Sequence, residues 1–143
     1  WGNFTRHDFE TVGLLSAPNS PHLMGLQEAK YLERLVNRAK VCHVSVLKLN
    51  FERREWFMID ALVSLASRER LDHVLIEFHT CSYGPWNQDL AKFYVEGLEK
   101  LHRYFYFVGS RQNNRGQVGT DPIRMPCCAK ATLVRKSLID RGE

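Results

Sequence analysis

The chain has 143 residues, of which 44% are hydrophobic and 25% are charged, and this composition excludes disordered and fibrous classes of protein. A chain of this length is expected to form a single domain with one hydrophobic core. The formal net charge is +4 and the basic residues form no long run, so nucleic-acid binding is not expected. No apolar stretch approaches the roughly 20 residues that cross a bilayer, and we expect no membrane span.

Strands and helices are predicted to alternate through the first part of the chain. Residues 9–15 predict a short strand that ends at a turn-rich segment. In residues 26–39 the apolar side chains recur at spacings of three and four, as the buried face of an amphipathic helix requires. A largely apolar strand is predicted at 41–49, and helical spacing returns at 55–68.

The same alternation continues toward the carboxyl terminus. A second buried strand is predicted at 71–78, followed by a loop and by a helix at 89–102. The aromatic segment 104–108 predicts a further strand. Residues 109–126 are rich in Arg, Gln, Asn and Gly, and they predict an exposed loop. The last strand is predicted at 127–134, and the helix-free connection allows it to pair antiparallel with the aromatic strand.

This order of elements predicts an α/β fold with a mostly parallel sheet, flanking helices and a carboxyl-terminal antiparallel strand pair. In open sheets of this type, ligands bind outside the carboxyl ends of the strands. Polar side chains gather at two such ends, since Asn50, Glu52 and Glu55 follow one strand and Glu77 and His79 follow the next. Glu77 and His79 are two residues apart and share one face of an extended strand. The sequence therefore places its candidate site residues at this edge of the sheet.

Two short motifs point to a family. Residues 47–56 read LKLNFERREW, and the next predicted strand ends in Glu-Phe-His at 77–79. These motifs, together with the order and separation of the elements from residue 9 onward, make the chain resemble a class I S-adenosylmethionine-dependent methyltransferase. The resemblance is to FkbM-type and related methyltransferase-like domains in particular. The family's fourth strand carries a signature close to Leu-Lys-hydrophobic-Asp-hydrophobic-Glu-Gly-x-Glu-Trp, and its fifth commonly ends in Glu-hydrophobic-His. The chain departs from this signature at Asn50, where the family has aspartate, and at Arg53, where it has glycine.

The resemblance implies that residues 1–143 form a single partial methyltransferase-like domain with a Rossmann-like fold. The family's sheet has the strand order 3-2-1-4-5-7-6, and the chain would supply strands 3 to 7. The family binds its methyl donor through a glycine-rich turn after strand 1 and an acidic residue at the end of strand 2, and neither motif precedes residue 9. We therefore expect a fragment completed by a missing amino-terminal segment or by another polypeptide, or a first strand that has moved inward. The expected cofactor is S-adenosylmethionine in the full-length protein, with none bound by this chain alone.

The resemblance also implies roles for the candidate residues. His79 is the natural general base for a hydroxyl or amine acceptor, because histidine titrates near neutral pH. Glu77 would orient His79 or bind a cation, whereas Asn50, Glu52 and Glu55 would bind the substrate. The acceptor is expected to be a small or glycan-like molecule.

Other uses of these residues stay open. The replacements at Asn50 and Arg53, together with the missing donor-binding motif, fit a non-catalytic scaffold or interaction module. Glu52, Glu77 and His79 also offer oxygen and nitrogen ligands to a divalent metal, as in a metal-dependent hydrolase. A purely structural alternative is that Glu77 pairs with an arginine and His79 caps a loop.

Four cysteines, at positions 42, 81, 127 and 128, lack the spacing of a zinc knuckle. On a buried strand, Cys127 and Cys128 would act as small apolar side chains. The glycosylation sequon at Asn3 and the four cysteines favour the secretory route.

Overall fold

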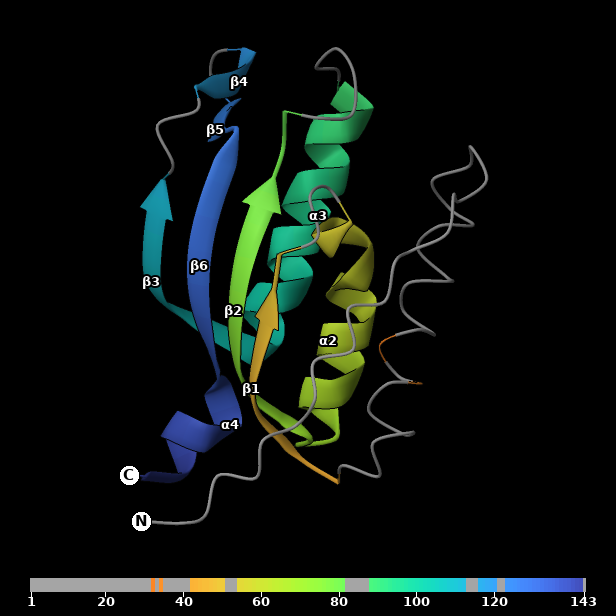
Figure 1. Cartoon of the computed structure of the whole chain (residues 1–143), viewed down its shortest axis with the longest axis vertical. Helices are drawn as coiled ribbons and strands as arrows, with labels where there is room; N and C mark the ends of the chain where they lie inside the picture. The colour runs from red at the N-terminus through yellow and green to blue at the C-terminus, as the bar shows by residue number, and fades with distance from the viewer. Residues whose placement is uncertain are drawn as a thin grey trace.

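A computed structural model describes residues 32, 34, 42–50, 54–81, 88–112, 116–120 and 123–142 (Figure 1). The strand predicted at 9–15 lies outside these residues. Of the helix predicted at 26–39, Leu32 and Arg34 are described, and both are helical. The elements follow in the order β1 (Val44–Leu49), η1 (Glu55–Met58), α2 (Ile59–Ser67), β2 (Leu71–His79), α3 (Gln88–Tyr104), β3 (Phe105–Gln112), β4 (Gln117–Thr120), β5 (Ile123–Pro126), β6 (Cys128–Arg135), α4 (Lys136–Ile139) and η2 (Asp140–Gly142).

A four-stranded sheet with the order β1-β2-β6-β3 forms the centre of the described structure (Figure 1). β1 pairs parallel with β2, whereas β6 pairs antiparallel with both β2 and β3. The predicted antiparallel pairing of the last strand with the aromatic strand is confirmed. The expectation of a mostly parallel sheet is wrong, and the sheet is mixed. The reason is that β6 returns without a crossover helix and inserts between two earlier strands, so it is antiparallel on both sides.

Helices α2 and α3 pack against each other and cover one face of the sheet (Figure 1). On β2, the side chains of Val74, Ile76 and Phe78 alternate into this layer and are buried. Leu65 of α2 and Leu101 of α3 meet them from the helix side. The hydrophobic core therefore lies between the sheet and these two helices. No helix in the described part of the chain has the length and apolar character that a bilayer crossing requires.

The opposite face of the sheet presents apolar side chains to solvent. Val46, His73, Val134 and Tyr106 form one cross-strand row over the four strands. Val46 is 57% exposed and Tyr106 is 37% exposed. Among the described residues, no strand pairs with the outer edge of β1.

The predicted loop at 109–126 is partly wrong. β3 continues to Gln112, and β4 and β5 pair antiparallel as a small hairpin outside the main sheet. Backbone groups supply the hydrogen bonds of a strand ladder, so a polar composition does not prevent pairing. Gly116 and Gly119 have φ angles of 93° and 117°, which glycine adopts without a steric penalty.

The other predicted elements are found with shifted ends. The helix predicted at 55–68 begins with the 3-10 turn η1 and continues as α2, and the helix predicted at 89–102 is α3. The strands predicted at 41–49, 71–78 and 127–134 correspond to β1, β2 and β6.

One disulfide ties the central strands together. It joins Cys81, which follows β2, to Cys127, which precedes β6, with the Cα atoms 4.7 Å apart. Cys42 and Cys128 are free thiols. The two adjacent cysteines therefore differ in bonding. Cys127 forms the disulfide, and Cys128 is the small buried side chain that we expected.

Candidate functional site

The candidate site lies at the carboxyl end of β2, where β1 and η1 meet it. β1 and β2 are parallel, so their carboxyl ends lie at the same edge of the sheet. The structure brings Glu55, Glu77 and His79 together at this edge. Asn50 is exposed at the end of β1. Glu52 lies outside the described residues.

A buried carboxylate holds His79 in place. Glu55 opens η1 and is fully buried. Its Oε1 atom accepts a hydrogen bond from the backbone N–H of His79 at 2.5 Å and a second from Nδ1 of the imidazole at 2.8 Å. An ionised carboxylate only accepts hydrogen bonds, so Nδ1 is the donor in this contact, and in the matching neutral tautomer Nε2 carries the lone pair.

Glu55 has a contact that the sequence did not predict. Its side chain has no exposed surface in this structure. Two hydrogen bonds join its carboxylate to His79. In this structure Glu55 positions His79, and its expected role in substrate binding stays a prediction.

Three further hydrogen bonds fix the backbone around His79. The indole nitrogen of Trp56 donates to the carbonyl oxygen of His79 at 2.9 Å. The hydroxyl of Tyr94 donates to the carbonyl oxygen of Thr80 at 3.0 Å, and the hydroxyl of Thr80 donates to the carbonyl oxygen of Pro126 at 2.6 Å. Because η1, α3 and β5 each make a hydrogen bond to residues 79–80, the backbone that carries the imidazole is held in one position.

An aromatic cluster closes the inner side of the site. The ring of Trp56 lies 4.6 Å from that of Phe78 and 4.4 Å from that of Tyr94, measured between centroids. Burial raises the pKa of Tyr94, and the negative charge of Glu55 raises that pKa further. Tyr94 therefore stays protonated at neutral pH and serves as a hydrogen-bond donor, not as a base.

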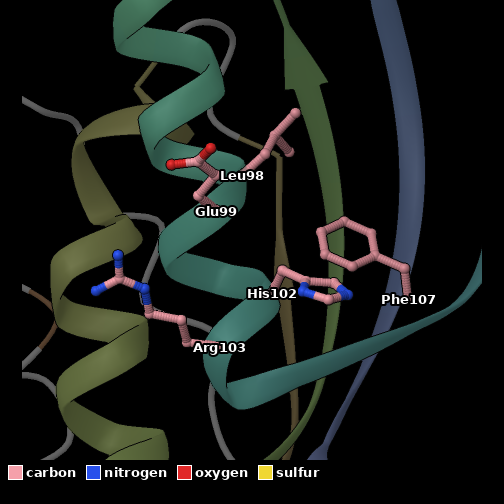
Figure 2. A pocket seen from close by; sticks show the side chains of 5 residues that line it. All are labelled: Leu98, Glu99, His102, Arg103 and Phe107. Atoms are coloured by element: carbon pink, nitrogen blue, oxygen red, sulfur yellow. The ribbon is translucent and has the colours of Figure 1, made fainter.

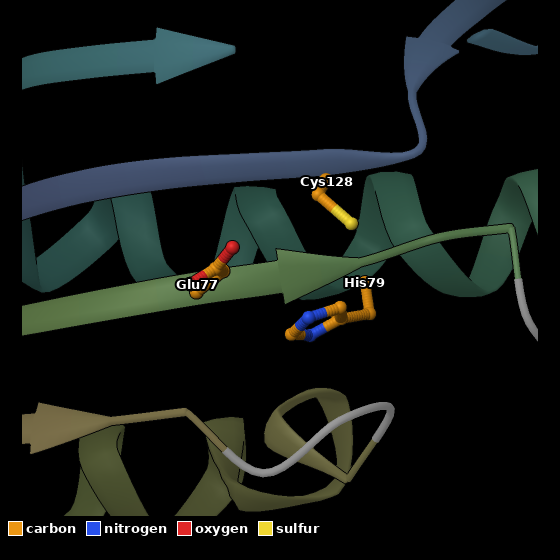
Figure 3. Close-up of side chains that lie close together, drawn as sticks. All are labelled: Glu77, His79 and Cys128. Atoms are coloured by element: carbon orange, nitrogen blue, oxygen red, sulfur yellow. The ribbon is translucent and has the colours of Figure 1, made fainter. Parts of the chain in front are cut away.

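Glu77 and His79 lie beside Cys128 at the start of β6 (Figure 3). One potential ligand atom from each residue lies within 4.8 Å of the other two. The strand register places Cys128 directly opposite His79. The Nζ atom of Lys130 lies 3.7 Å from the Glu77 carboxylate, so a lysine is one cation near Glu77. A carboxylate, an imidazole and a thiol thus share one small region of the sheet.

Sequence reasoning missed Cys128 as a member of this site. The residue is 49 positions after His79, and the antiparallel pairing of β6 with β2 alone brings the two together. No local motif indicates that pairing. A disulfide assignment between Cys81 and Cys127 would have fixed the register and placed Cys128 beside His79.

A shallow depression lies elsewhere, between the carboxyl-terminal half of α3 and the start of β3 (Figure 2). It contains none of the candidate site residues. It lies toward the opposite end of the sheet from the tip of β2 (Figure 1). Its lining residues are Leu98, Glu99, His102, Arg103 and Phe107.

Comparisons with protein-family models, with curated proteins and with solved structures found no match to the chain.

Proposed function

We propose that the chain is part of an S-adenosylmethionine-dependent methyltransferase-like domain. The strand order carries this proposal. The order β1-β2-β6-β3, in which the last strand inserts antiparallel between two earlier ones, corresponds to the 4-5-7-6 portion of the class I methyltransferase sheet. In most sheets, strands that are consecutive in sequence lie next to each other. A last strand that inserts between two earlier strands is therefore uncommon, and it narrows the choice of fold.

His79 is the proposed general base. Methyl transfer to a hydroxyl or amine needs alignment of the acceptor with the donor and removal of one proton from the acceptor. The Glu55 carboxylate fixes the ring and its tautomer, and this leaves Nε2 able to accept a proton. A base oriented by a third group is the arrangement that general-base catalysis uses repeatedly. Asn50, exposed at the neighbouring strand end, is the proposed substrate contact.

The methyl donor is proposed to bind to a segment that adds along β1. The described residues leave the outer edge of β1 unpaired, and Val46 on this strand is 57% exposed. A further part of the same polypeptide, or a second polypeptide, would pair there and supply the glycine-rich turn for S-adenosylmethionine. The isolated chain is accordingly proposed to bind no donor.

The test is transfer of a tritiated methyl group from S-adenosylmethionine by the native protein to a panel of hydroxyl-bearing small molecules and glycans. We expect His79→Gln to lower kcat by about 10²- to 10⁴-fold, because an amide cannot take up the acceptor's proton. The matched control is His102→Gln on α3, which lies in the depression away from the site. Equal turnover of wild type and His79→Gln would remove His79 from the mechanism.

A non-catalytic scaffold is the second candidate function. It is favoured by Asn50 and Arg53, which stand where the family has an aspartate and a glycine. Native protein that binds no S-adenosylmethionine would support the scaffold. For either function we propose the secretory route, and the Cys81–Cys127 disulfide supports it because such bonds persist in oxidising compartments.

A further inference from the structure

We propose that Glu77, His79 and Cys128 form a zinc site, with Glu55 as the outer carboxylate that orients the histidine. The site uses one imidazole nitrogen, one thiolate sulfur and one carboxylate oxygen. These are the three ligand types that zinc takes from proteins. The proposal does not depend on methyl transfer.

The strand geometry places the three ligands without any rearrangement of the backbone. Glu77 and His79 share one face of β2, and Cys128 is the cross-strand neighbour of His79 on β6. Their potential ligand atoms lie within 4.8 Å of one another. In a tetrahedral zinc site the ligand atoms are about 3.5 Å apart, which follows from metal–ligand distances of about 2.0 to 2.3 Å. Side-chain rotations would shorten the distances between the ligand atoms to this value, chiefly at Glu77, whose side chain has three rotatable bonds.

The hydrogen bond between Glu55 and His79 is the second observation that points to a metal. Metal-binding histidines donate their other ring N–H to a carboxylate or carbonyl, and this fixes the tautomer and raises the basicity of the ligating nitrogen. The 2.8 Å contact between Nδ1 of His79 and Oε1 of Glu55 meets this requirement. Glu55 is fully buried, so its carboxylate contacts the imidazole out of reach of solvent. Nε2 of His79 is then the ligand atom.

The surroundings suit a thiolate ligand. Cys128 is buried and free, whereas the adjacent Cys127 is held in the disulfide. Zinc binding would replace the proton of the Cys128 thiol, and that proton would pass to solvent. One thiolate, one carboxylate and one neutral imidazole balance the two positive charges of the ion. The side chains of Glu77 and His79 are 14% and 13% exposed, so an ion can enter from the open face of the sheet and keep water as its fourth ligand.

Zinc and an acceptor proton would compete for the same atom. If His79 is the general base, zinc bound to Nε2 prevents this nitrogen from accepting a proton. Micromolar zinc would then inhibit the native protein reversibly. This consequence rests on the proposed function, whereas zinc binding itself does not. Direct metal titration therefore separates the failure of one proposal from the failure of the other.

The experiment titrates the 143-residue chain, carrying Cys42→Ser, with Co²⁺ as a spectroscopic substitute for zinc. In this background, with the disulfide intact, Cys128 is the one free thiol among the four cysteines of the sequence. We expect a thiolate-to-cobalt charge-transfer absorption that saturates at one equivalent and is abolished by one equivalent of Zn²⁺. Cys128→Ser should abolish the absorption. Glu55→Gln should weaken metal affinity by about 10- to 100-fold, which is the usual effect of losing an outer carboxylate.

Matched variants and a second measurement keep the test decisive. His43→Ala, at the other end of β1, should leave cobalt affinity unchanged, whereas Glu77→Gln should weaken it at least tenfold. If Cys128→Ser does not fold, alkylation of Cys128 in the folded background protein takes its place, and zinc should slow this reaction at least tenfold. No charge-transfer absorption in the background protein would overturn the proposal. Absorption that persists in Cys128→Ser, or alkylation that zinc does not slow, would overturn it equally.

Discussion

Glu55 satisfies two donors of His79 with one oxygen atom, and it does so without contact with solvent. A buried carboxylate is costly unless hydrogen bonds compensate for the loss of water. Here two of the compensating donors belong to His79, the residue that general-base catalysis and zinc binding would use. At the residue scale, the candidate site is therefore built around a positioning carboxylate that sequence reasoning had assigned to substrate.

The first prediction concerns this carboxylate and stability. Glu55→Ala leaves the backbone N–H of His79 buried without its partner, and we expect the free energy of unfolding to fall by about 3 kcal/mol. Glu55→Gln keeps an acceptor oxygen at the same place, so its loss should be about 1 kcal/mol. Urea denaturation followed by circular dichroism measures both. Equal losses for the two variants would contradict the role of the hydrogen bonds.

A second, partly buried carboxylate, that of Asp72, lies at the opposite end of β2. Asp72 bonds Nη2 of Arg135 at 2.9 Å and Nε2 of His43 at 2.6 Å. Burial alone would raise the pKa of Asp72, but the hydrogen bonds and charges of these two partners outweigh burial and hold its pKa below the ordinary value of 3.8. The ionised form is therefore bound more favourably in the folded state than in the unfolded state.

This lowered pKa predicts an acid dependence of stability. The contribution of Asp72 is fully present above its unfolded pKa and is lost as the pH falls below about 4 toward the folded pKa. Thermal unfolding between about pH 7 and pH 2 should thus show a shallower acid slope for Asp72→Asn than for the wild type. Asp60→Asn serves as a control at neutral pH, because the exposed pair of Asp60 with Lys100 should contribute under about 1 kcal/mol. An identical acid slope for Asp72→Asn and wild type would refute the assignment.

At the scale of elements, hydrophobic periodicity was a reliable guide and strand pairing was not. The spacing of apolar residues predicted β1, β2, α3 and β6, because each buries a regular face against the core. The hairpin of β4 and β5 was missed, since its two strands have four residues each and form a separate two-stranded sheet outside the main one. The insertion of β6 beside β2 depends on contacts between residues far apart in sequence. This insertion placed Cys128 in the site, and no local pattern could have predicted it.

The disulfide gives a prediction at this scale, because it links the end of β2 to the start of β6. The bridge closes a loop with a sequence separation of 46 residues. Loop-closure entropy for this length stabilises the folded state by about 4 kcal/mol. The double variant Cys81→Ser and Cys127→Ser should therefore unfold at a lower denaturant concentration. An unchanged midpoint under non-reducing conditions would show that the bridge does not constrain the unfolded chain.

At the scale of the whole molecule, the two sides of the sheet differ. One face is buried under α2 and α3, whereas the other exposes Val46, Leu75 and Tyr106, and β1 keeps an edge that no described strand pairs. This asymmetry is expected of a sheet that continues into a further segment. The strand order β1-β2-β6-β3 is the observation on which the proposed methyltransferase half-domain rests.

Calorimetric titration with S-adenosylmethionine tests this central claim most directly. The native protein and the isolated 143-residue chain are titrated under the same non-reducing conditions. We predict saturable binding of one donor molecule per native protein and no heat of binding for the isolated chain. A native protein that binds no S-adenosylmethionine, or an isolated chain that binds it as tightly as the native protein, would contradict the account.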